Sequence, residues 1–277
     1  MKIASALVLL TLLTTSLSKG LDDWSQTEIL RAQVHPKVRI IGGQEVEPHS
    51  VPYQVGLIIN NYQYFCGEAL ISQNYVITAA HCGIVMRTVD VVLGAHNITN
   101  AEEATQITIS GEKVILHQDY NDTSYLNDIA LIKLSQEVSY SDYIQPIKLP
   151  SASDEVYDYQ VAIATGWGLA KDVPFPSIRD MSQVLLGVEV AVTNMTDCSG
   201  YYNDEEYTWV TSGNICTSGY RNKGTCGGDS GGPLALGGVL IGLTSFGTDL
   251  CELCSPSVYT KIDYYLDWIA ANSDVTL

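Results

Sequence analysis

Positively charged side chains are scarce in this chain of 277 residues. It has 14 Lys and Arg against 31 Asp and Glu, a formal net charge of -17 and a pI near 4.4. A protein that binds nucleic acid or an anionic membrane surface needs basic groups to neutralise phosphates. We therefore expect neither nucleic acid nor membrane among its partners.

The chain also lacks an apolar run long enough to cross a bilayer, which takes roughly 20 residues. The amino-terminal run from Ile3 to Leu13 is too short, follows Lys2, and precedes the small residues Ser16 and Ser18. This pattern predicts a signal peptide over residues 1–18, cleaved after Ser18. An exported protein meets an oxidising environment, so its 7 cysteines are interpreted first as disulfides and its location as extracellular.

Residues 19–39 contain no cysteine and no periodicity, and they end in Lys37-Val38-Arg39 before Ile40-Ile41-Gly42-Gly43. A basic residue before an apolar pair and two glycines indicates a cleavage site. We interpret residues 19–39 as an activation propeptide and residues 40–277 as the mature domain. That domain is still more acidic, with 9 basic and 28 acidic residues.

Low-complexity segments and repeats of fixed period are absent from the sequence. After Gly43, short runs rich in Val, Ile, Leu and Tyr alternate with turn residues, which is an all-β pattern. The runs are Val51–Asn60, Tyr75–Ala79, Val89–Leu93, Gln106–Ile109, Glu112–Leu116, Ile129–Leu134, Gln160–Ala164, Leu185–Val192, Gly213–Cys216, Pro233–Leu236, Val239–Thr244 and Ser257–Lys261. They form two β halves, at about 40–147 and 148–277. A C-terminal helix is predicted where Ile262, Leu266, Ile269 and Ala270 recur at helical spacing.

Three segments carry the chemistry, and each contains one reactive side chain. They are Thr78-Ala79-Ala80-His81-Cys82, Asn127-Asp128-Ile129-Ala130-Leu131 and Gly227-Gly228-Asp229-Ser230-Gly231-Gly232-Pro233. A serine hydroxyl becomes a useful nucleophile when a neutral imidazole takes its proton. A buried carboxylate can hold that imidazole in place, and a glycine-rich loop can aim backbone N–H groups at a developing oxyanion.

From Ile40 to about Ile269, the chain resembles the chymotrypsin-like family of serine peptidases, with His, Asp and Ser in that family's chain order. The resemblance implies a double six-stranded antiparallel β-barrel with a C-terminal helix, and peptide hydrolysis through an acyl-enzyme. It assigns the general base to His81, its orienting carboxylate to Asp128 and the nucleophile to Ser230. The oxyanion hole falls to the N–H groups of Gly228 and Ser230.

The family also implies further roles around this site. Ser245 hydrogen-bonds the triad aspartate, and its segment, with Phe246 and Gly247, pairs with the substrate backbone. Activation follows cleavage after Arg39 by a trypsin-like peptidase. The freed ammonium of Ile40 then pairs with Asp229 and orders the oxyanion hole.

Three disulfides are implied by the resemblance, Cys66–Cys82, Cys198–Cys216 and Cys226–Cys251. The residues alone leave 105 ways to choose and pair six of seven cysteines. Cys254 is left over, as a buried free thiol, a competitor of Cys251 for Cys226, or a link between chains. No cofactor is implied. Ala95 and Thr105 stand where relatives bind calcium through glutamates, so no metal site is expected, and Glu68 departs from the usual glycine.

Three positions of the specificity pocket, Gly224 at the base, Gly247 at the entrance and Ser257 on the inner wall, carry no charge. Burying a substrate Arg or Lys without a counter-ion is costly, so we expect cleavage after Phe, Tyr or Leu. The segments Leu243–Gly247 and Tyr264–Ile269 are similar to those of arthropod digestive chymotrypsins and brachyurin-like serine collagenases. This favours a monomeric digestive enzyme, with the gut lumen as its site of action, protein and peptide substrates, and proteinaceous inhibitors as partners. The alternatives are a regulatory cascade peptidase and a catalytically inactive binding protein.

Overall fold

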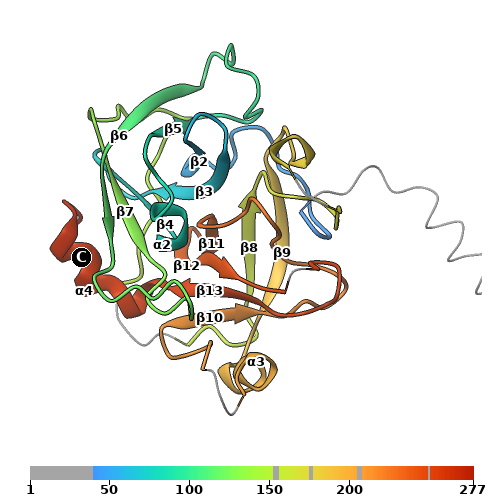
Figure 1. Ribbon diagram of the computed structural model, residues 1–277. Coiled ribbons are helices and arrows are strands. Elements are labelled where there is room, and N and C mark those ends of the chain that lie inside the picture. The colour runs from blue at the N-terminus through green and yellow to red at the C-terminus, as the bar shows by residue number, and fades with distance from the viewer. Residues whose placement is uncertain (1–39, 152–155, 175–176, 205–207, 249) are drawn as a thin grey trace, which may run out of the picture. The chain divides into compact units, whose positions relative to one another are not determined.

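The computed structural model describes residues 40–277 except 152–155, 175–176, 205–207 and 249. The expected signal peptide and propeptide, residues 1–39, lie outside the described residues. Nearly all regular structure in the described part is β-strand, arranged in two closed barrels (Figure 1). No helix among the described residues has the length and apolar character to cross a membrane.

The first barrel closes in the order β2-β3-β4-β7-β6-β5, with every pairing antiparallel. Its strands are β2 (Gln54–Ile59), β3 (Tyr64–Leu70), β4 (Tyr75–Thr78), β5 (Val89–Leu93), β6 (Ile107–Leu116) and β7 (Ala130–Leu134). Inward-facing aliphatic side chains such as Leu57, Leu70 and Val91 fill the interior. Closure leaves no unpaired sheet edge and holds the strand ends that carry the site.

The second barrel closes in the order β8-β9-β10-β13-β12-β11, again antiparallel throughout. Its strands are β8 (Val161–Gly166), β9 (Leu186–Thr193), β10 (Asn214–Thr217), β11 (Pro233–Leu236), β12 (Val239–Phe246) and β13 (Ser257–Lys261). The short strand β1 (Gln44–Glu45) precedes the first barrel in sequence but pairs with β9 of the second. These two six-stranded barrels confirm the expected fold.

The helices are short and lie at the ends of the barrels. They are α2 (Ala80–Gly83), η1 (Ile178–Asp180), α3 (Met195–Tyr202), η2 (Ile262–Tyr265) and α4 (Leu266–Asn272). The C-terminal helix is where the helical spacing placed it, and its Leu266 and Ile269 pack in one buried cluster with Ile77 and Leu131 of the first barrel. In Figure 1 it lies beside β7. This apolar cluster joins the barrels on either side of the site.

Glu68 is a buried acid inside the first barrel. It lies on β3 between Cys66 and Leu70, which belong to the barrel's apolar core, and opposite Val55 on β2. The side chain is 0% exposed, and neither carboxylate oxygen has a hydrogen-bond partner in the described part of the chain. Burial raises the pKa of Glu68 well above its ordinary value. At a pH between the ordinary pKa and the raised pKa, Glu68 is therefore protonated in the folded protein and ionised in the unfolded protein.

We expect Glu68→Gln to stabilise the protein at pH 8 and to leave its stability at pH 4 nearly unchanged. A raised pKa means that stability is lost as pH rises above the unfolded value, and glutamine removes that loss. A gain of about 1 to 3 kcal/mol corresponds to a melting temperature about 3 °C or more higher at pH 8. Calorimetry at both pH values tests this, with the exposed Glu47→Gln as control. Equal shifts at the two pH values would contradict the proton-binding explanation.

Candidate active site

His81 and Asp128 meet at the first barrel, where α2 follows β4 and where Asp128 precedes β7. His81 Nδ1 donates to Asp128 Oδ2 at 2.8 Å, and the His81 backbone N–H donates to Oδ1 at 2.8 Å. The aspartate is 1% exposed, whereas the histidine side chain is 18% exposed. The carboxylate thus fixes the imidazole while the ring keeps access to solvent, as the sequence predicted for these two positions.

The second barrel also contacts this carboxylate. Ser245 on β12 donates its hydroxyl hydrogen to Asp128 Oδ2 at 2.6 Å, and Thr260 on β13 donates to the Asp128 carbonyl at 2.6 Å. The two bonds from His81 and the one from Ser245 therefore satisfy a buried carboxylate whose charge would otherwise be costly. The bonds from Ser245 and Thr260 also fix the position of one barrel against the other at the site.

Ser230 lies in the glycine-rich loop that precedes β11. Its carbonyl accepts a hydrogen bond from Gly67 N–H of β3 at 2.7 Å, which places the loop against the first barrel. Gly228 has φ of +94°, and a Cβ there would fall 2.3 Å from Met181 Cε. Only glycine fits both conditions without strain, so the loop retains the turn that could present its N–H groups to an oxyanion.

Asp229 is completely buried behind this loop. Its carboxylate accepts hydrogen bonds from Gly168 N–H at 2.8 Å and Cys226 N–H at 3.0 Å. Burial raises the pKa of Asp229 to about 7, and the two backbone donors partly oppose that shift. Ile40 is also 0% exposed, and the Ile41 carbonyl accepts from Gly224 N–H at 3.2 Å. The start of the described chain is therefore seated in the second barrel.

A cavity of about 120 Å³ adjoins Ser230. Its lining comprises Thr225, Cys226, Gly227, Ser230, Thr244, Ser245, Phe246, Gly247, Thr248 and Cys251. Three predicted substrate-binding residues, Ser245, Phe246 and Gly247, are among them. The predicted pair Gly224 and Ser257 lies outside this lining but close together, since a Cβ on Gly224 would fall 2.8 Å from Ser257 Oγ. Among the described residues, the lining contains no Asp, Glu, Lys, Arg or His, and its two cysteines form a disulfide.

A second cavity, of about 320 Å³, lies beside His81 and was not expected from the sequence. It is lined by Tyr125, Tyr202, Trp209, Phe246 and Gly247. The Tyr125 ring contacts the His81 ring edge-on at 5.7 Å and leans on Phe246 at 5.7 Å. With 17 tyrosines in the chain, no spacing in the sequence distinguishes the two that gather here.

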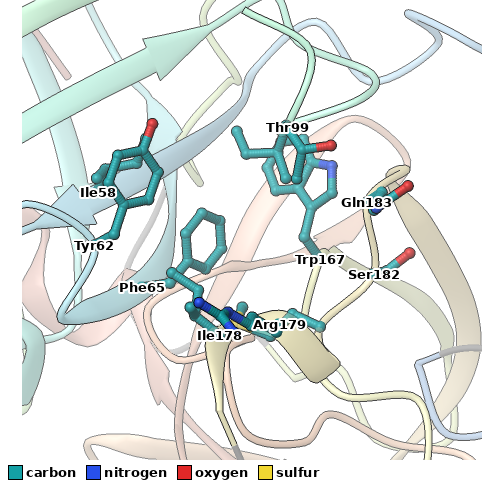
Figure 2. Close-up of a pocket in the computed structure, with 11 residues that line it drawn as sticks. Ile58, Tyr62, Phe65, Thr99, Trp167, Ile178, Arg179, Ser182 and Gln183 are labelled. Atoms are coloured by element: carbon teal, nitrogen blue, oxygen red, sulfur yellow. The ribbon is translucent and has the colours of Figure 1, made fainter.

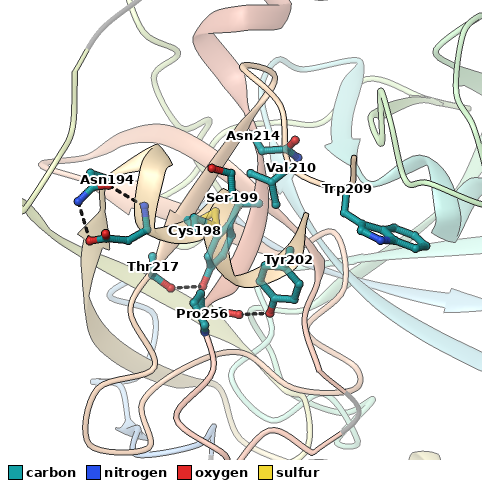
Figure 3. Close-up of a disulfide and its surroundings, with 12 residues drawn as sticks. Asn194, Cys198, Ser199, Tyr202, Trp209, Val210, Asn214, Thr217 and Pro256 are labelled. Atoms are coloured by element: carbon teal, nitrogen blue, oxygen red, sulfur yellow. Dashed lines mark hydrogen bonds between the residues drawn. A yellow bond between two sulfur atoms is a disulfide. The ribbon is translucent and has the colours of Figure 1, made fainter. Parts of the chain in front are cut away.

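Helix α3 positions one wall of this aromatic cavity (Figure 3). Asn194 caps the helix by accepting from Asp197 N–H at 2.8 Å, and the Cys198–Cys216 disulfide ties the helix to β10. The Tyr202 hydroxyl donates to the Pro256 carbonyl, and its ring packs edge-on against Phe246 at 5.5 Å. The tyrosine is therefore held from both ends.

The structure contains the three disulfides implied by the resemblance, Cys66–Cys82, Cys198–Cys216 and Cys226–Cys251. Cys254 is a free, exposed thiol whose Sγ lies 2.6 Å from Asn222 Oδ1, so the alternative of a buried thiol is wrong. Two groups of metal-binding side chains occur among the described residues, but each includes cysteines that are already in these disulfides. Neither group has the free thiolates that would hold an ion.

Comparison with known proteins places this geometry in a family. The model of the Trypsin family matches residues 40–269. Brachyurin of Leptuca pugilator is 43% identical over 238 residues, covering 86% of this chain and 100% of that protein. Chymotrypsin of Phaedon cochleariae is 33% identical, covering 97% of this chain and 98% of its own length. The solved structure of HL collagenase superposes with a TM-score of 0.76 at 31% identity, covering 86% of this chain and all of that one. The chain is a member of the trypsin family of serine endopeptidases.

Proposed function

We propose that Ser230 attacks the scissile carbonyl while His81 takes its proton, and that Asp128 stabilises the imidazolium that forms. The observation that carries this assignment is the set of hydrogen bonds converging on the buried Asp128 carboxylate, from His81 and Ser245. His81 then returns the proton to the leaving amine, and water hydrolyses the acyl-enzyme by the reverse sequence. The N–H groups of Gly228 and Ser230 stabilise the oxyanion in both steps.

The protein is made, on this proposal, as a secreted zymogen with a signal peptide at residues 1–18 and a propeptide at residues 19–39. Brachyurin of Leptuca pugilator aligns over its whole length in an alignment of 238 residues, which is the number of residues in segment 40–277. The complete burial of Ile40 within the apolar core of the second barrel supports Arg39–Ile40 as the bond that is cut. A trypsin-like peptidase is the activating partner.

For substrate preference, we propose cleavage after Phe, Tyr or Leu. A cavity of about 120 Å³ is of the size that accepts a single aromatic ring, since an apolar protein cavity of about 150 Å³ binds benzene. Nothing in its lining would neutralise a substrate cation. The Ser257 hydroxymethyl group next to Gly224 leaves less room for an indole, so Trp should fit less well.

We expect kcat/KM for substrates with Phe at the cleaved bond to exceed that for Arg by at least about 100-fold, or about 2.7 kcal/mol in transition-state energy. Gly224→Asp should reverse the order by supplying a carboxylate at the pocket base. Ser257→Gly should raise the rate on Trp relative to Phe. Matched peptide anilides measure all three. Comparable wild-type rates on Arg and Phe would mean that these positions do not set the preference.

We propose digestive proteolysis as the biological role, by analogy with brachyurin and chymotrypsin, to which the chain is similar. A regulatory cascade enzyme is the second candidate within the same chemistry. Profiling the activated protein on a peptide library separates the two, because a digestive enzyme accepts many sequences around the cleaved residue and a cascade enzyme accepts few.

A further inference from the structure

A third cavity, distinct from the aromatic cavity beside His81 but also of about 320 Å³, lies beside the oxyanion loop, away from the specificity pocket. Met181 lines this cavity and also contacts Gly228, since a Cβ on that glycine would fall 2.3 Å from Met181 Cε. Phe65, another lining residue, directly precedes Cys66, whose disulfide partner follows His81. The specificity pocket is lined by other residues, 225–227, 230, 244–248 and 251. This third cavity and the specificity pocket therefore flank the glycine-rich loop and share no lining residue.

In the proposed mechanism, the part of the substrate that leaves Ser230 runs toward this cavity. The side chain before the scissile bond occupies the specificity pocket, so the residues after that bond continue away from it. An extended peptide advances about 3.3 Å per residue. The first three residues after the bond thus span about 10 Å, which brings them along Gly228 and Met181 toward Phe65.

Aromatic and aliphatic side chains form most of the cavity walls, Thr99, Ser182 and Gln183 are polar, and Arg179 is the one charged residue among the described lining residues. Figure 2 shows the rings of Tyr62, Phe65 and Trp167 around the cavity, with Arg179 on the side of η1. Trp167 is fully buried, and its indole N–H donates to the His96 carbonyl at 3.0 Å. The indole wall is therefore fixed, whereas Arg179 is exposed.

Arg179 has no carboxylate partner among the described residues, although residues 40–277 contain 28 acids. Its neighbour Asp180 is engaged elsewhere, because its carboxylate accepts from Ser177 N–H at 3.0 Å and from the Ser177 hydroxyl at 2.7 Å. That reciprocal cap holds the one-turn helix in shape. Arg179 is thus an exposed cation on this short helix, without a carboxylate partner in the part of the chain that the structure describes.

The leaving-group segment of the substrate runs along this cavity, and we propose that Arg179 selects an acidic side chain within the first three residues of that segment. The inference rests on the proposed function and names a substrate class for it. A guanidinium keeps its charge at every working pH and can grip a carboxylate with two parallel hydrogen bonds. The aromatic walls exclude water on one side of that pair, which makes it stronger than a fully exposed ion pair.

The test uses internally quenched peptides with Phe at the cleaved bond and Glu, Gln or Lys at each of the next three positions in turn. The readout is the ratio of kcat/KM for Glu over Gln, which cancels any general loss of activity. The activated wild-type protein should prefer Glu by about fivefold at one position, and 1 M salt should reduce that ratio. Arg179→Gln should bring the ratio to about one, and Arg179→Glu should invert it. Lys171→Gln removes an equal charge from the same segment outside the cavity and should keep the wild-type ratio.

Two results would overturn the inference: wild-type ratios within twofold of one at all three positions, or a preference for Glu that survives in Arg179→Gln. An anilide that ends at the scissile bond separates this from failure of the proposed function. Absence of wild-type hydrolysis of the anilide refutes the function itself. Hydrolysis of the anilide without an acidic preference in the peptides refutes only the role of Arg179.

Discussion

Replacing Ser230 by alanine should lower kcat/KM of the activated protein by about 10⁴-fold or more, because no other side chain at the loop can form the acyl-enzyme. The backbone of residue 230 bonds to Gly67 through its carbonyl, which alanine preserves, so the fold should be intact. Hydrolysis of a Phe anilide measures the loss. The exposed Ser50→Ala serves as the matched control and should retain full activity.

A fluorophosphonate probe gives an independent measurement of the same nucleophile. It should label the activated wild-type protein at Ser230, as located by peptide mapping, and should not label Ser230→Ala. An activated protein that takes up no probe would instead support the alternative of a catalytically inactive binding protein. The two readouts together distinguish a lost nucleophile from a lost substrate pocket.

Cleavage after Arg39 should raise kcat/KM by about 100-fold or more. Among the described residues, no basic side chain forms an ion pair with the buried Asp229, and omitting the charge partner of a buried group costs about 3 to 5 kcal/mol. In the proposed activation mechanism, the freed Ile40 ammonium supplies that partner and so favours the ordered oxyanion loop. Trypsin treatment followed by mass analysis of the new amino terminus tests this. Arg39→Ala should block conversion, whereas Arg31→Ala, in the same propeptide, should not.

The pH dependence of stability tests the Asp229 partnership directly. With its pKa raised to about 7 from 3.8, the uncut chain binds an extra proton and loses stability as pH rises from about 4 to 7, by about 4 kcal/mol. Cleavage should remove this loss, and so should Asp229→Asn in the uncut chain. Melting curves at pH 5 and pH 8 measure both. Full activity in uncut protein, or identical pH dependence before and after cleavage, would refute the mechanism.

The family resemblance in the sequence predicted two barrels, which the structure confirms, and three reactive side chains, but the local pattern did not predict every strand. Strand β3 was missed because Gly67 and Glu68 interrupt its apolar alternation. Conversely, the two runs at 106–109 and 112–116 form one strand, β6, with a bulge between Gly111 and Lys113. Helix α3 escaped notice because its residues are mostly polar and include Gly200. Local pattern does not reveal a strand whose partners, rather than its own residues, determine its pairing.

Side chains that gather from distant segments were the other omission. Tyr125 and Tyr202 reach one cavity from the two barrels, and Arg179 reaches another from the short helix η1. None of these lies in a recognisable motif, so only the packed structure brings them together. The residues in motifs could be predicted because each lies in a short segment whose sequence is characteristic of the chemistry proposed for it.

The path of β1 has a consequence for how enzymes of this design can diversify. The segment after the cleavage position joins the second barrel through Gln44 and Glu45, which pair with β9. That barrel also supplies Asp229, Ser230 and the specificity pocket, while the first supplies His81 and Asp128. In the proposed mechanism, substitutions in the second barrel can therefore change the substrate preference or the activation step without altering His81 and Asp128 in the first barrel. The hydrogen bond from the Ser245 hydroxyl to the Asp128 carboxylate joins these two halves.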